Sequence, residues 1–471
     1  MPSNDKHVFT REKEKDLNAK TQRRKDLFLP LSLYAFTFKF FYFYLDLLSG
    51  VRNLFAPLRL CVKKCFLFLF IFHVLSLQAT VQVGLDRIYD PSYINLFKGK
   101  KIGLITNQTG ISKEMKSSLD VFLAGEKKYH FNIVALFAPE HGLTGISHAW
   151  DKIFDGKIGK IPVFSLHGDT KRPTKKMLEH VDILVYDIQD IGSRSYTYIS
   201  TLFFAMEEAA KAGIPVVVLD RPNPINGLVV DGPMLEDEWR SIVGYINVPY
   251  CHGMTVGELA SLFNREYKIG CSLHVVPMSG WKRKMSFADT GLPWIPTSPH
   301  IPEASTVYYY PMTGILGELQ LVNIGIGFTL PFKLVGAPWI DAEKFADHLN
   351  EQKLPGVYFH PFHYKPFYGT LANQECHGVM IFIKNHQKYL PVTTQYVIIG
   401  LLKSLYPDHF SAALIKSKHR ETMFAKVNGT SSIYPILKDK QYIAWELREF
   451  HKKERLAFLK IRDQYLFDEY K

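Results

Sequence analysis

The sequence predicts an α/β fold, in which a Rossmann-like, doubly wound and mostly parallel sheet is followed by a smaller α+β domain. Three observations predict this fold. Continuous apolar runs alternate with helix-like stretches, as in a parallel sheet that helices cover on both faces. Each run ends in polar residues, and after residue 231 the chain changes to shorter mixed segments rich in Tyr, Pro and Gly. The apolar runs are residues 101–106, 131–138, 183–188 and 214–220.

The bulk composition is that of a globular chain with room for more than one domain. The chain has 471 residues, of which 47% are hydrophobic and 22% charged, so it can bury a sizeable core. We expect a basic leader over residues 1–80, a Rossmann-like domain over 81–231 and a C-terminal α+β domain over 232–471.

Most of the positive charge lies in the leader. Residues 1–80 carry 13 Lys and Arg against 6 Asp and Glu, so they hold seven of the twelve net positive charges. The remaining 391 residues carry only the other five and lack a basic run interleaved with aromatics. Nucleic acid is therefore not an expected partner.

The end of the leader has the layout of a signal peptide over residues 63–79. Lys63 and Lys64 precede an apolar run that is too short to span a bilayer comfortably, and the small residue Ala79 follows it. We therefore expect an exported protein, periplasmic or extracellular, that meets the membrane only through this leader. Two explanations stay open for residues 1–60: an over-extended gene start, or a true extension that an uncleaved signal anchor holds in the membrane. The oligomeric state is not indicated.

Neither a metal nor a cofactor is expected. Outside the leader, Cys251, Cys271 and Cys376 are widely spaced and form no CxxC motif. Buried free thiols are expected, with a Cys251–Cys271 disulfide as the alternative. The glycine-rich loops that hold a nucleotide pyrophosphate do not occur after the first apolar run, so a nucleotide cofactor is not supported.

The polar residues that follow the four apolar runs predict one site. The carboxyl ends of parallel strands open on the same edge of a sheet, and ligands of open α/β sheets bind there. We therefore expect these residues to converge on one crevice. They are Asn107 and Gln108, Glu140 and His141, Asp187 and Asp190, and Asp220, Arg221 and Asn223.

Glu140 is the predicted general acid. It follows the second apolar run, precedes Gly142 and stands near the apolar Phe137 and Leu143, so it is placed at the mouth of the sheet. A carboxyl group in such a position is suited to proton transfer. The alternative is that Glu140 caps a turn and that His141 is an ordinary surface residue.

The segment after the third run carries residues suited to an acidic sugar. Asp187, Asp190, Arg194, Tyr196 and Tyr198 lie within twelve residues. Arginine can clamp a carboxylate with two parallel hydrogen bonds, and tyrosine offers a flat face and a hydroxyl group. An internal Asp–Arg ion pair that shapes the loop is the alternative, and the two are compatible.

Three further features complete the predicted site. Glu207, on the following helix, is a candidate for a second catalytic carboxylate. The loop 220–224 is stiffened by two prolines and is either a binding loop or a stiff turn. His252 can reach the crevice from the second domain, just before a helix that Thr255 and Glu258 open with a capping box.

Five segments, in this order, resemble the NamZ-type exo-β-N-acetylmuramidases. Each is weak alone, but five in series are specific, and the resemblance covers about residues 82–340. The segments are Gly103-Leu-Ile-Thr-Asn107-Gln108-Thr-Gly110, Ala138-Pro-Glu140-His141-Gly142, Asp187-Ile-Gln-Asp190-Ile-Gly192-Ser-Arg194-Ser-Tyr196-Thr197-Tyr198, Leu219-Asp220-Arg221-Pro222-Asn223-Pro224 and His252-Gly-Met-Thr-Val-Gly-Glu-Leu-Ala.

The resemblance implies a cleft between the two domains and the removal of N-acetylmuramic acid from non-reducing ends of peptidoglycan fragments. Glu140 corresponds to the family's proposed catalytic acid, and the lactyl carboxylate of the sugar would give Arg194 or Arg221 a ligand. One stretch departs from the family pattern: Glu318 is kept, but Ile326 stands where the family has arginine. This departure affects the expected substrate contacts more than the expected fold.

The leading hypothesis is hydrolysis of a terminal muramyl glycoside by a pair of acidic residues without a metal. Glu140 is the acid, and its partner comes from Asp187, Asp190, Glu207 or Glu318, with Glu207 and Asp187 as the first choices and Glu318 also placed among the substrate contacts. A non-catalytic cell-wall sugar-binding protein on the same fold is the alternative. A third is another Rossmann-like transferase or hydrolase with a small acidic substrate.

Overall fold

The computed structural model describes residues 81–148 and 151–471, so the predictions for the leader lie outside the described residues. The described residues form one compact unit. We divide it into a first lobe, residues 81–305, and a second lobe, residues 306–471. Over the described ranges, no helix is both long enough and apolar enough to cross a bilayer.

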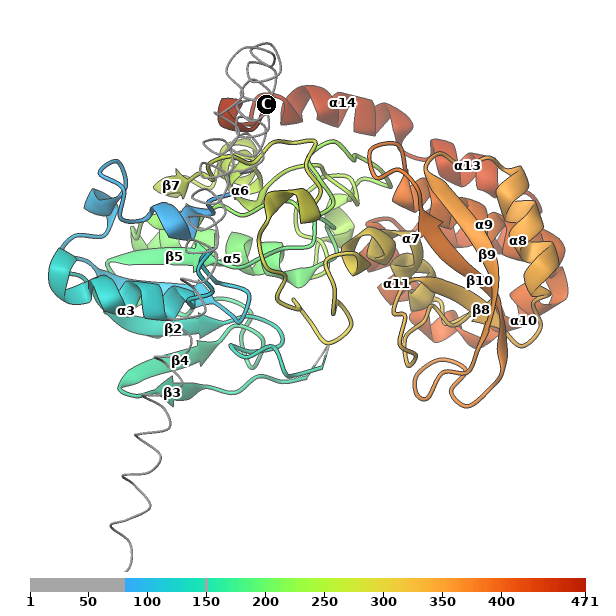
Figure 1. Ribbon diagram of the computed structural model, residues 1–471, viewed down its shortest axis with the longest axis horizontal. Helices are drawn as coiled ribbons and strands as arrows, with labels where there is room; N and C mark the ends of the chain where they lie inside the picture. The colour runs from blue at the N-terminus through green and yellow to red at the C-terminus, as the bar shows by residue number, and fades with distance from the viewer. Residues whose placement is uncertain (1–80, 149–150) are drawn as a thin grey trace, which may run out of the picture. The chain divides into compact units, whose positions relative to one another are not determined.

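The first lobe is built on a seven-stranded sheet in the order β3-β4-β2-β1-β5-β6-β7. All neighbouring strands run parallel except β3, which pairs antiparallel with β4. The predicted mostly parallel, doubly wound sheet is therefore confirmed (Figure 1). The strands are β1 Lys101–Thr106, β2 Asn132–Ala138, β3 Gly156–Ile158, β4 Ile161–Ser165, β5 Ile183–Asp187, β6 Val216–Leu219 and β7 Leu273–Val276.

The sheet continues past the boundary that composition predicts at residue 231. Strand β7 pairs with β6 in parallel, from Val216 opposite Leu273 to Leu219 opposite Val276. The segment between them contains helix α6, Val256–Glu266, and the predicted capping box at its start is present. Residues 232–276 thus complete the first sheet, because an eleven-residue helix suffices to cross from one parallel strand to the next.

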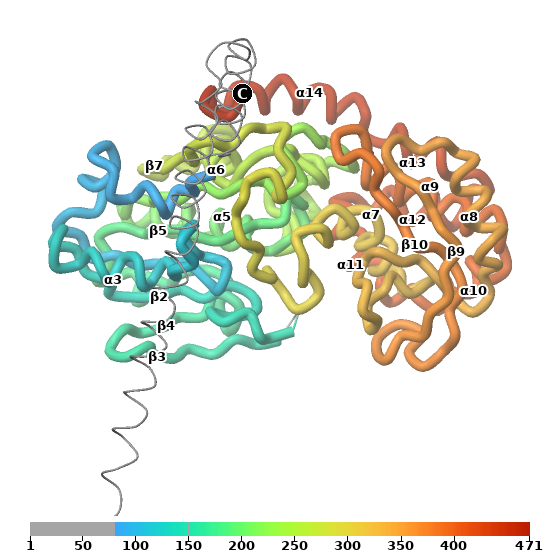
Figure 2. The backbone as a smooth tube through the Cα atoms, viewed as in Figure 1, coloured from blue at the N-terminus to red at the C-terminus, as the bar shows by residue number. Residues whose placement is uncertain are grey.

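The second lobe has a small antiparallel sheet, in the order β8-β10-β9, that helices cover. Figures 1 and 2 show α8 and α9 beside this sheet, and α7 and α11 on its side toward the first lobe. Helix α14 runs back to the first lobe, where the hydroxyl of Tyr470 accepts a hydrogen bond from the amide of Met278 (2.8 Å). The strands are β8 Leu334–Ala337, β9 Val357–Tyr364 and β10 Cys376–Ile383.

The helices of the two lobes are as follows. The first lobe has α3 Ser118–Tyr129, α4 Lys175–Leu178, α5 Thr197–Ala212 and α6. The second has α7 Thr306–Glu318, α8 Ala342–Glu351, α9 Pro391–Leu405, α10 Pro407–Lys416, α11 Glu421–Asn428, α12 Ile433–Asp439, α13 Ala444–Glu449 and α14 Lys452–Arg462.

Apolar strands and helix faces account for the core. The side chains of β5 and β6 are buried on both faces, as expected for central strands of a sheet covered by helices. The predicted cysteine state is also confirmed, because Cys251, Cys271 and Cys376 are free and buried.

Arg194 is a fully buried cation that joins the two lobes. Its guanidinium donates to the carbonyls of Pro233 and Val248 (2.7 Å each) in the first lobe. It also donates to the carbonyls of Val427 (3.2 Å) and Asn428 (2.5 Å), at the C-terminal end of α11. Because these carbonyls carry the negative end of the helix dipole, a cation is favourable there. The prediction that Arg194 clamps a substrate carboxylate is wrong, since backbone carbonyls occupy its guanidinium.

Asp187 forms a buried ion pair with Arg221, which lies outside the 187–198 segment where the sequence left an internal Asp–Arg pair as the alternative. The guanidinium donates to both carboxylate oxygens (2.5 and 2.9 Å), and Ser118 donates to the same carboxylate (2.5 Å). Both side chains are nearly inaccessible. The cavity that Arg221 lines at this end of the sheet measures about 10 Å³, which is at most enough for a single water molecule. This pair therefore stabilises the fold at the end of the sheet where β1 and β5 lie side by side, and it does not face a substrate-sized cavity.

Asp220 and Asp190 are also buried framework groups. Asp220 accepts hydrogen bonds from Thr255 (2.8 Å), from the amide of Gly257 (2.8 Å) and from Tyr470 (2.7 Å), so it ties β6 to α6 and to the chain's end. Asp190 accepts from the amide of Gly192 (2.7 Å). Burial raises the pKa of Asp190 to about 7, and backbone hydrogen bonds oppose the rise.

Replacing Arg194 with Met should lower the free energy of unfolding by at least about 3 kcal/mol, because four buried carbonyls lose a charged donor. Urea unfolding followed by circular dichroism measures the change. The matched control is Arg448→Met, an exposed position, for which we expect a change within about 0.5 kcal/mol. Equal stability of the two variants would contradict the role given to Arg194.

Because of Asp190, the free energy of unfolding should decrease as the pH rises. Its carboxyl has an ordinary pKa of 3.8 when unfolded and about 7 when folded. Between these values the folded protein keeps a proton that the unfolded chain has released. This stabilisation is present at low pH and is lost as the pH rises through 7, by on the order of 2 kcal/mol between pH 5.5 and 8. Asp190→Asn should reduce this slope in unfolding curves measured across that range, and an unchanged slope would contradict the assignment.

Candidate functional site

A cavity of about 580 Å³ lies between the two lobes. Its size is in the usual range for small-molecule sites. The first lobe lines it with the residues after β2, the start of α5 and the loop at 298–301; the second lobe contributes α7 and residues around 322–326 and 369–370. Of the predicted site residues, it brings together four: Glu140, His141, Tyr196 and Glu318.

Glu140 is held in a turn at the end of β2. His141 and Gly142, which follow it, both have a positive φ (69° and 76°), and the amide of Gly142 donates to the carbonyl of Pro139 (3.0 Å). Glycine adopts such a φ without strain, so Gly142 suits the second of these positions. The turn directs Glu140 toward the start of α5, where the hydroxyl of Thr197 donates to its Oε2 (2.6 Å). Glu140 is 5% exposed, so its carboxyl is shielded from bulk water.

Two basic side chains lie near Glu140. Nε2 of His167 is 3.6 Å from Oε1 of Glu140. Burial lowers the pKa of His167, and the charge of Glu140 opposes this change. Burial likewise lowers the pKa of Lys171, again against the charge of Glu140. Glu140 thus has groups beside it that can hold or pass a proton.

Glu318 is the second carboxylate of the cavity. It is the last residue of α7, and Arg420 donates to its Oε2 (2.5 Å). Burial raises the pKa of Glu318, and the charge of Arg420 opposes the rise. Tyr310 lies within electrostatic reach of both carboxylates: burial raises its pKa to about 12, and the charges of Glu318 and Glu140 add to the rise.

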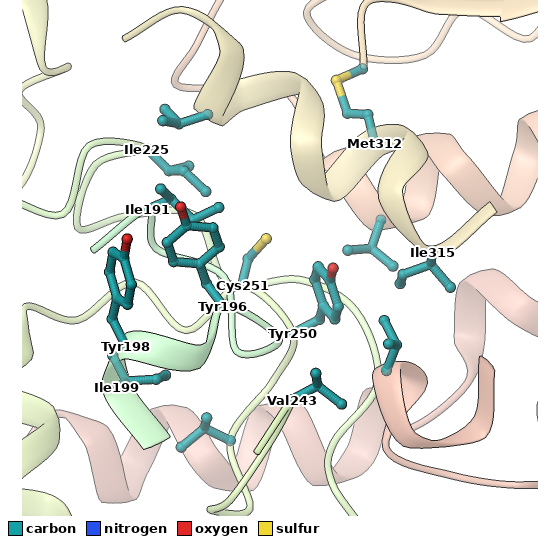
Figure 3. Packing of buried hydrophobic residues seen from close by; sticks show 14 of the residues in the cluster. Ile191, Tyr196, Tyr198, Ile199, Ile225, Val243, Tyr250, Cys251, Met312 and Ile315 are labelled. Atoms are coloured by element: carbon teal, nitrogen blue, oxygen red, sulfur yellow. The ribbon is translucent and has the colours of Figure 1, made fainter. Parts of the chain in front are cut away.

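Hydroxyl groups connect the two lobes at the cavity wall. Oγ of Ser195 lies within hydrogen-bonding distance of the hydroxyls of Tyr250 (2.7 Å) and Tyr310 (3.1 Å). The hydroxyl of Tyr196 donates to Oγ1 of Thr297 (2.8 Å). Figure 3 shows the rings of Tyr196 and Tyr250 among buried side chains that include Met312 and Ile315 of α7. Hydrogen bonds therefore hold this wall rigidly. Its hydroxyl groups lie at the cavity, and apolar side chains pack against the wall on the side away from it.

Three histidines line the first-lobe side of the cavity: His141, His148 and His300. Nδ1 of His141 is 2.7 Å from the carbonyl of Ser147, and this contact orients the ring. Burial lowers the pKa of His300, and the charges of His148 and His141 add to the fall, so both of these rings lie within electrostatic reach of His300.

Eleven predicted site residues do not line this cavity, among them Gln108, which donates to the carbonyl of Pro296 (2.8 Å). Five of them are the buried residues described under the overall fold: Asp187, Asp190, Arg194, Asp220 and Arg221. Glu207 pairs with Arg172 and accepts a hydrogen bond from Tyr245 (3.0 Å), so the structure does not place it as a partner of Glu140. The rest are engaged locally. Asn107 accepts from Thr109, Tyr198 donates to the carbonyl of Thr297, Asn223 donates to the carbonyl of Met254, and His252 accepts from the amide of Met254.

The predicted arginine clamp has no counterpart at the cavity. Among the described residues that line it, none is Lys or Arg. Arg194 and Arg221 were predicted as clamps because the sequence shows a charge at a strand end but not which side chain it meets. Ile326, which stands where the family pattern has arginine, lines the cavity as an apolar side chain.

Sequence reasoning missed several residues around Glu140. Thr197 and Ser195 lie inside the predicted 187–198 segment but were not singled out, and His300 and Tyr310 lie outside every segment predicted to carry site residues. His167 and Lys171 follow β4, whose position beside β2 is set by the sheet order. A short strand with no motif after it gave no signal for them. Within the described ranges, no group of His, Cys, Asp and Glu is arranged to hold a metal ion.

Two family models match this chain. The N-terminal model of exo-β-N-acetylmuramidase NamZ matches residues 102–305, and the C-terminal model matches residues 308–467. The first model ends and the second begins beside Thr306, where α7 starts. A relative, peptidoglycan β-N-acetylmuramidase NamZ of Bacillus subtilis (strain 168), is 45% identical over 333 residues, which are 70% of this chain and 79% of that protein.

Two solved structures have the same fold. Both are DUF1343 family proteins of Bacteroides fragilis NCTC 9343. The first is 41% identical with a TM-score of 0.76, and the second is 27% identical with a TM-score of 0.63. Each match covers 83% of this chain and 99% of the other. The paired model matches and the 45% identical relative show that the chain belongs to the family of exo-β-N-acetylmuramidase NamZ.

Proposed function

We propose that this protein is an exo-acting glycoside hydrolase that releases N-acetylmuramic acid from the non-reducing ends of peptidoglycan fragments. The observation that carries the proposal is the pair of carboxylates, Glu140 and Glu318, on the wall of one cavity in a chain of this family. Nothing in the comparisons favours a non-catalytic sugar-binding protein.

Glu140 acts as the general acid. Its Oε2 is held by Thr197, and its Oε1 lies near His167, so the carboxyl has a defined orientation toward the cavity. In the proposed reaction, Glu140 gives its proton to the glycosidic oxygen as the bond to the anomeric carbon breaks. His167 and Lys171 are placed to restore that proton after the aglycone leaves.

Glu318 is the partner carboxylate. Of the four candidates from the sequence, it is the one that lines the cavity with Glu140. Its ion pair with Arg420 favours the charged form that is needed to activate water or to stabilise positive charge on the sugar ring. Tyr310, which lines the same cavity, lies within electrostatic reach of both carboxylates.

The acidic group of the sugar meets a different surface from the one that the sequence predicts. Since lysine and arginine are absent from the described lining, we assign its recognition to the imidazoles of His141, His148 and His300. Imidazole N–H groups can donate hydrogen bonds to the carboxylate of the acidic sugar.

The export of the protein is also a proposal, and it rests on the signal-peptide layout of residues 63–79. Oxidising compartments favour disulfides, and the cysteines of the described ranges are free and buried, so they give no support for export. Export therefore has to be tested directly.

Glu140→Gln and Glu318→Gln should each lower kcat by about 10²- to 10⁴-fold, because each loses proton transfer or charge at the reacting centre. Release of a chromogenic aglycone from a β-N-acetylmuramide measures the rate. KM should change much less than kcat, since both substitutions keep the size and shape of the side chain.

The matched control is Glu207→Gln, the same substitution at a carboxylate that pairs with Arg172 outside the cavity. We expect its kcat to stay within about threefold of the wild type. Activity lost in Glu207→Gln but kept in Glu318→Gln would restore the sequence-based choice of partner. A wild type that releases no aglycone would refute the hydrolase.

N-terminal sequencing of the protein recovered from the periplasm or the medium should find a start near residue 80. Cleavage after the small residue Ala79 is the physical basis for this position. Recovery of the protein in the cytosol, or of an exported protein that still carries residues 1–60, would contradict the cleaved leader.

A further inference from the structure

Two exposed aromatic side chains stand at the rim of the cavity. Phe367 is 70% exposed and Tyr368 is 54% exposed, although both are large and apolar. Gly369 and Thr370, the next residues, line the cavity itself. Exposed apolar patches with polar residues at their edge mark binding surfaces, and this pair adjoins a polar-lined cavity.

The second lobe holds this loop in one conformation. Gly327 has a φ of +85°, and a Cβ atom there would clash with the carbonyl of Tyr368. The amide of Phe367 donates to the carbonyl of Gly327 (2.7 Å). The buried side chain of Asn323 donates to the carbonyls of Ile326 (2.9 Å) and Thr370 (2.8 Å). Glycine and a buried amide thus fix the backbone beneath the exposed rings.

Ring contacts orient both exposed side chains. Phe367 stacks on Phe328, with centroids 6.4 Å apart and an interplanar angle of 20°. Phe328 in turn packs against Tyr364 of β9 (5.5 Å). Tyr368 stacks on His300 of the first lobe (6.3 Å, 25°), and its hydroxyl lies 3.1 Å from Nε2 of that histidine. The rim is therefore continuous with the cavity on both lobes.

The stretch that departs from the family pattern contributes to this rim. Ile326 lines the cavity, and Phe328 stands behind Phe367. This part of the cavity wall is therefore apolar and continues outward into the exposed rings.

We propose that Phe367 and Tyr368 form a sugar-binding platform for the aglycone side of the substrate, that is, for the sugars that follow the terminal one in a peptidoglycan glycan fragment. This inference rests on the proposed function. Sugar rings present C–H groups on their faces, which pack on aromatic rings, while the Tyr368 hydroxyl can bond to sugar hydroxyls. Because the platform is already rigid, little ordering opposes binding.

The test compares a short and a long substrate. The short one is a chromogenic β-N-acetylmuramide, and the long one is a peptide-free glycan tetrasaccharide with N-acetylmuramic acid at its non-reducing end. In Phe367→Ala and in Tyr368→Ala, the ratio of kcat/KM for the long substrate to kcat/KM for the short one should fall about threefold to tenfold. Tyr368→Phe, which keeps the ring, should lose less.

Trp445→Ala is the matched control. Trp445 is 72% exposed on α13 and does not line the cavity, so its variant should keep the wild-type ratio. Phe367→Leu keeps the apolar bulk without the aromatic ring and replaces Phe367→Ala if that variant does not fold.

Three outcomes would overturn the platform. A wild type inactive on both substrates refutes the proposed function and the platform with it. An active wild type whose ratio is unchanged by Phe367→Ala, Phe367→Leu and Tyr368→Ala leaves the hydrolase standing and refutes the platform alone. A wild type that self-associates and is dispersed by Phe367→Ala at an unchanged ratio assigns the rings to contact with a second copy instead.

Discussion

The fully buried guanidinium of Arg194 is the interaction on which the arrangement of the two lobes depends. It sits just before α5 in the first lobe and donates to the carbonyls that end α11 in the second. Gly429 ends that helix with a φ of +84°, and a Cβ atom there would lie 2.6 Å from the guanidinium. Since the cavity takes residues from both lobes, this cation keeps its two walls in register.

The two walls of the cavity are held rigidly relative to each other. Glu140 comes from the first lobe and Glu318 from the second, and Ser195 and Tyr310 join the lobes by a hydrogen bond between them (3.1 Å). In the proposed reaction, two carboxylates that are held rigidly by different lobes would need little reorganisation. The buried polar residues at the ends of β5 and β6 also keep the cavity rigid, because they hold the loops that carry the site.

The predictions from sequence succeeded where the signal is local. Buried runs such as residues 183–188 identify strands of a covered parallel sheet, and Thr255 with Glu258 identifies the start of α6, because both patterns depend on near neighbours. They were wrong for Arg194, whose four partners are at positions 233, 248, 427 and 428. A motif shows that a charge is present, but distant chain segments decide whether it faces a ligand or a backbone carbonyl.

By itself, the sequence determined the class of the fold, the family and the position of Glu140 at the end of a strand. These follow from hydrophobic periodicity and from motifs that are contiguous in the chain. Only the tertiary structure decided that Glu318 shares a cavity with Glu140, while Asp187 and Glu207 pair with arginines elsewhere. The physical reason is that the environment of a carboxylate depends on the groups that folding brings within a few ångströms of it, and those groups lie up to hundreds of residues away.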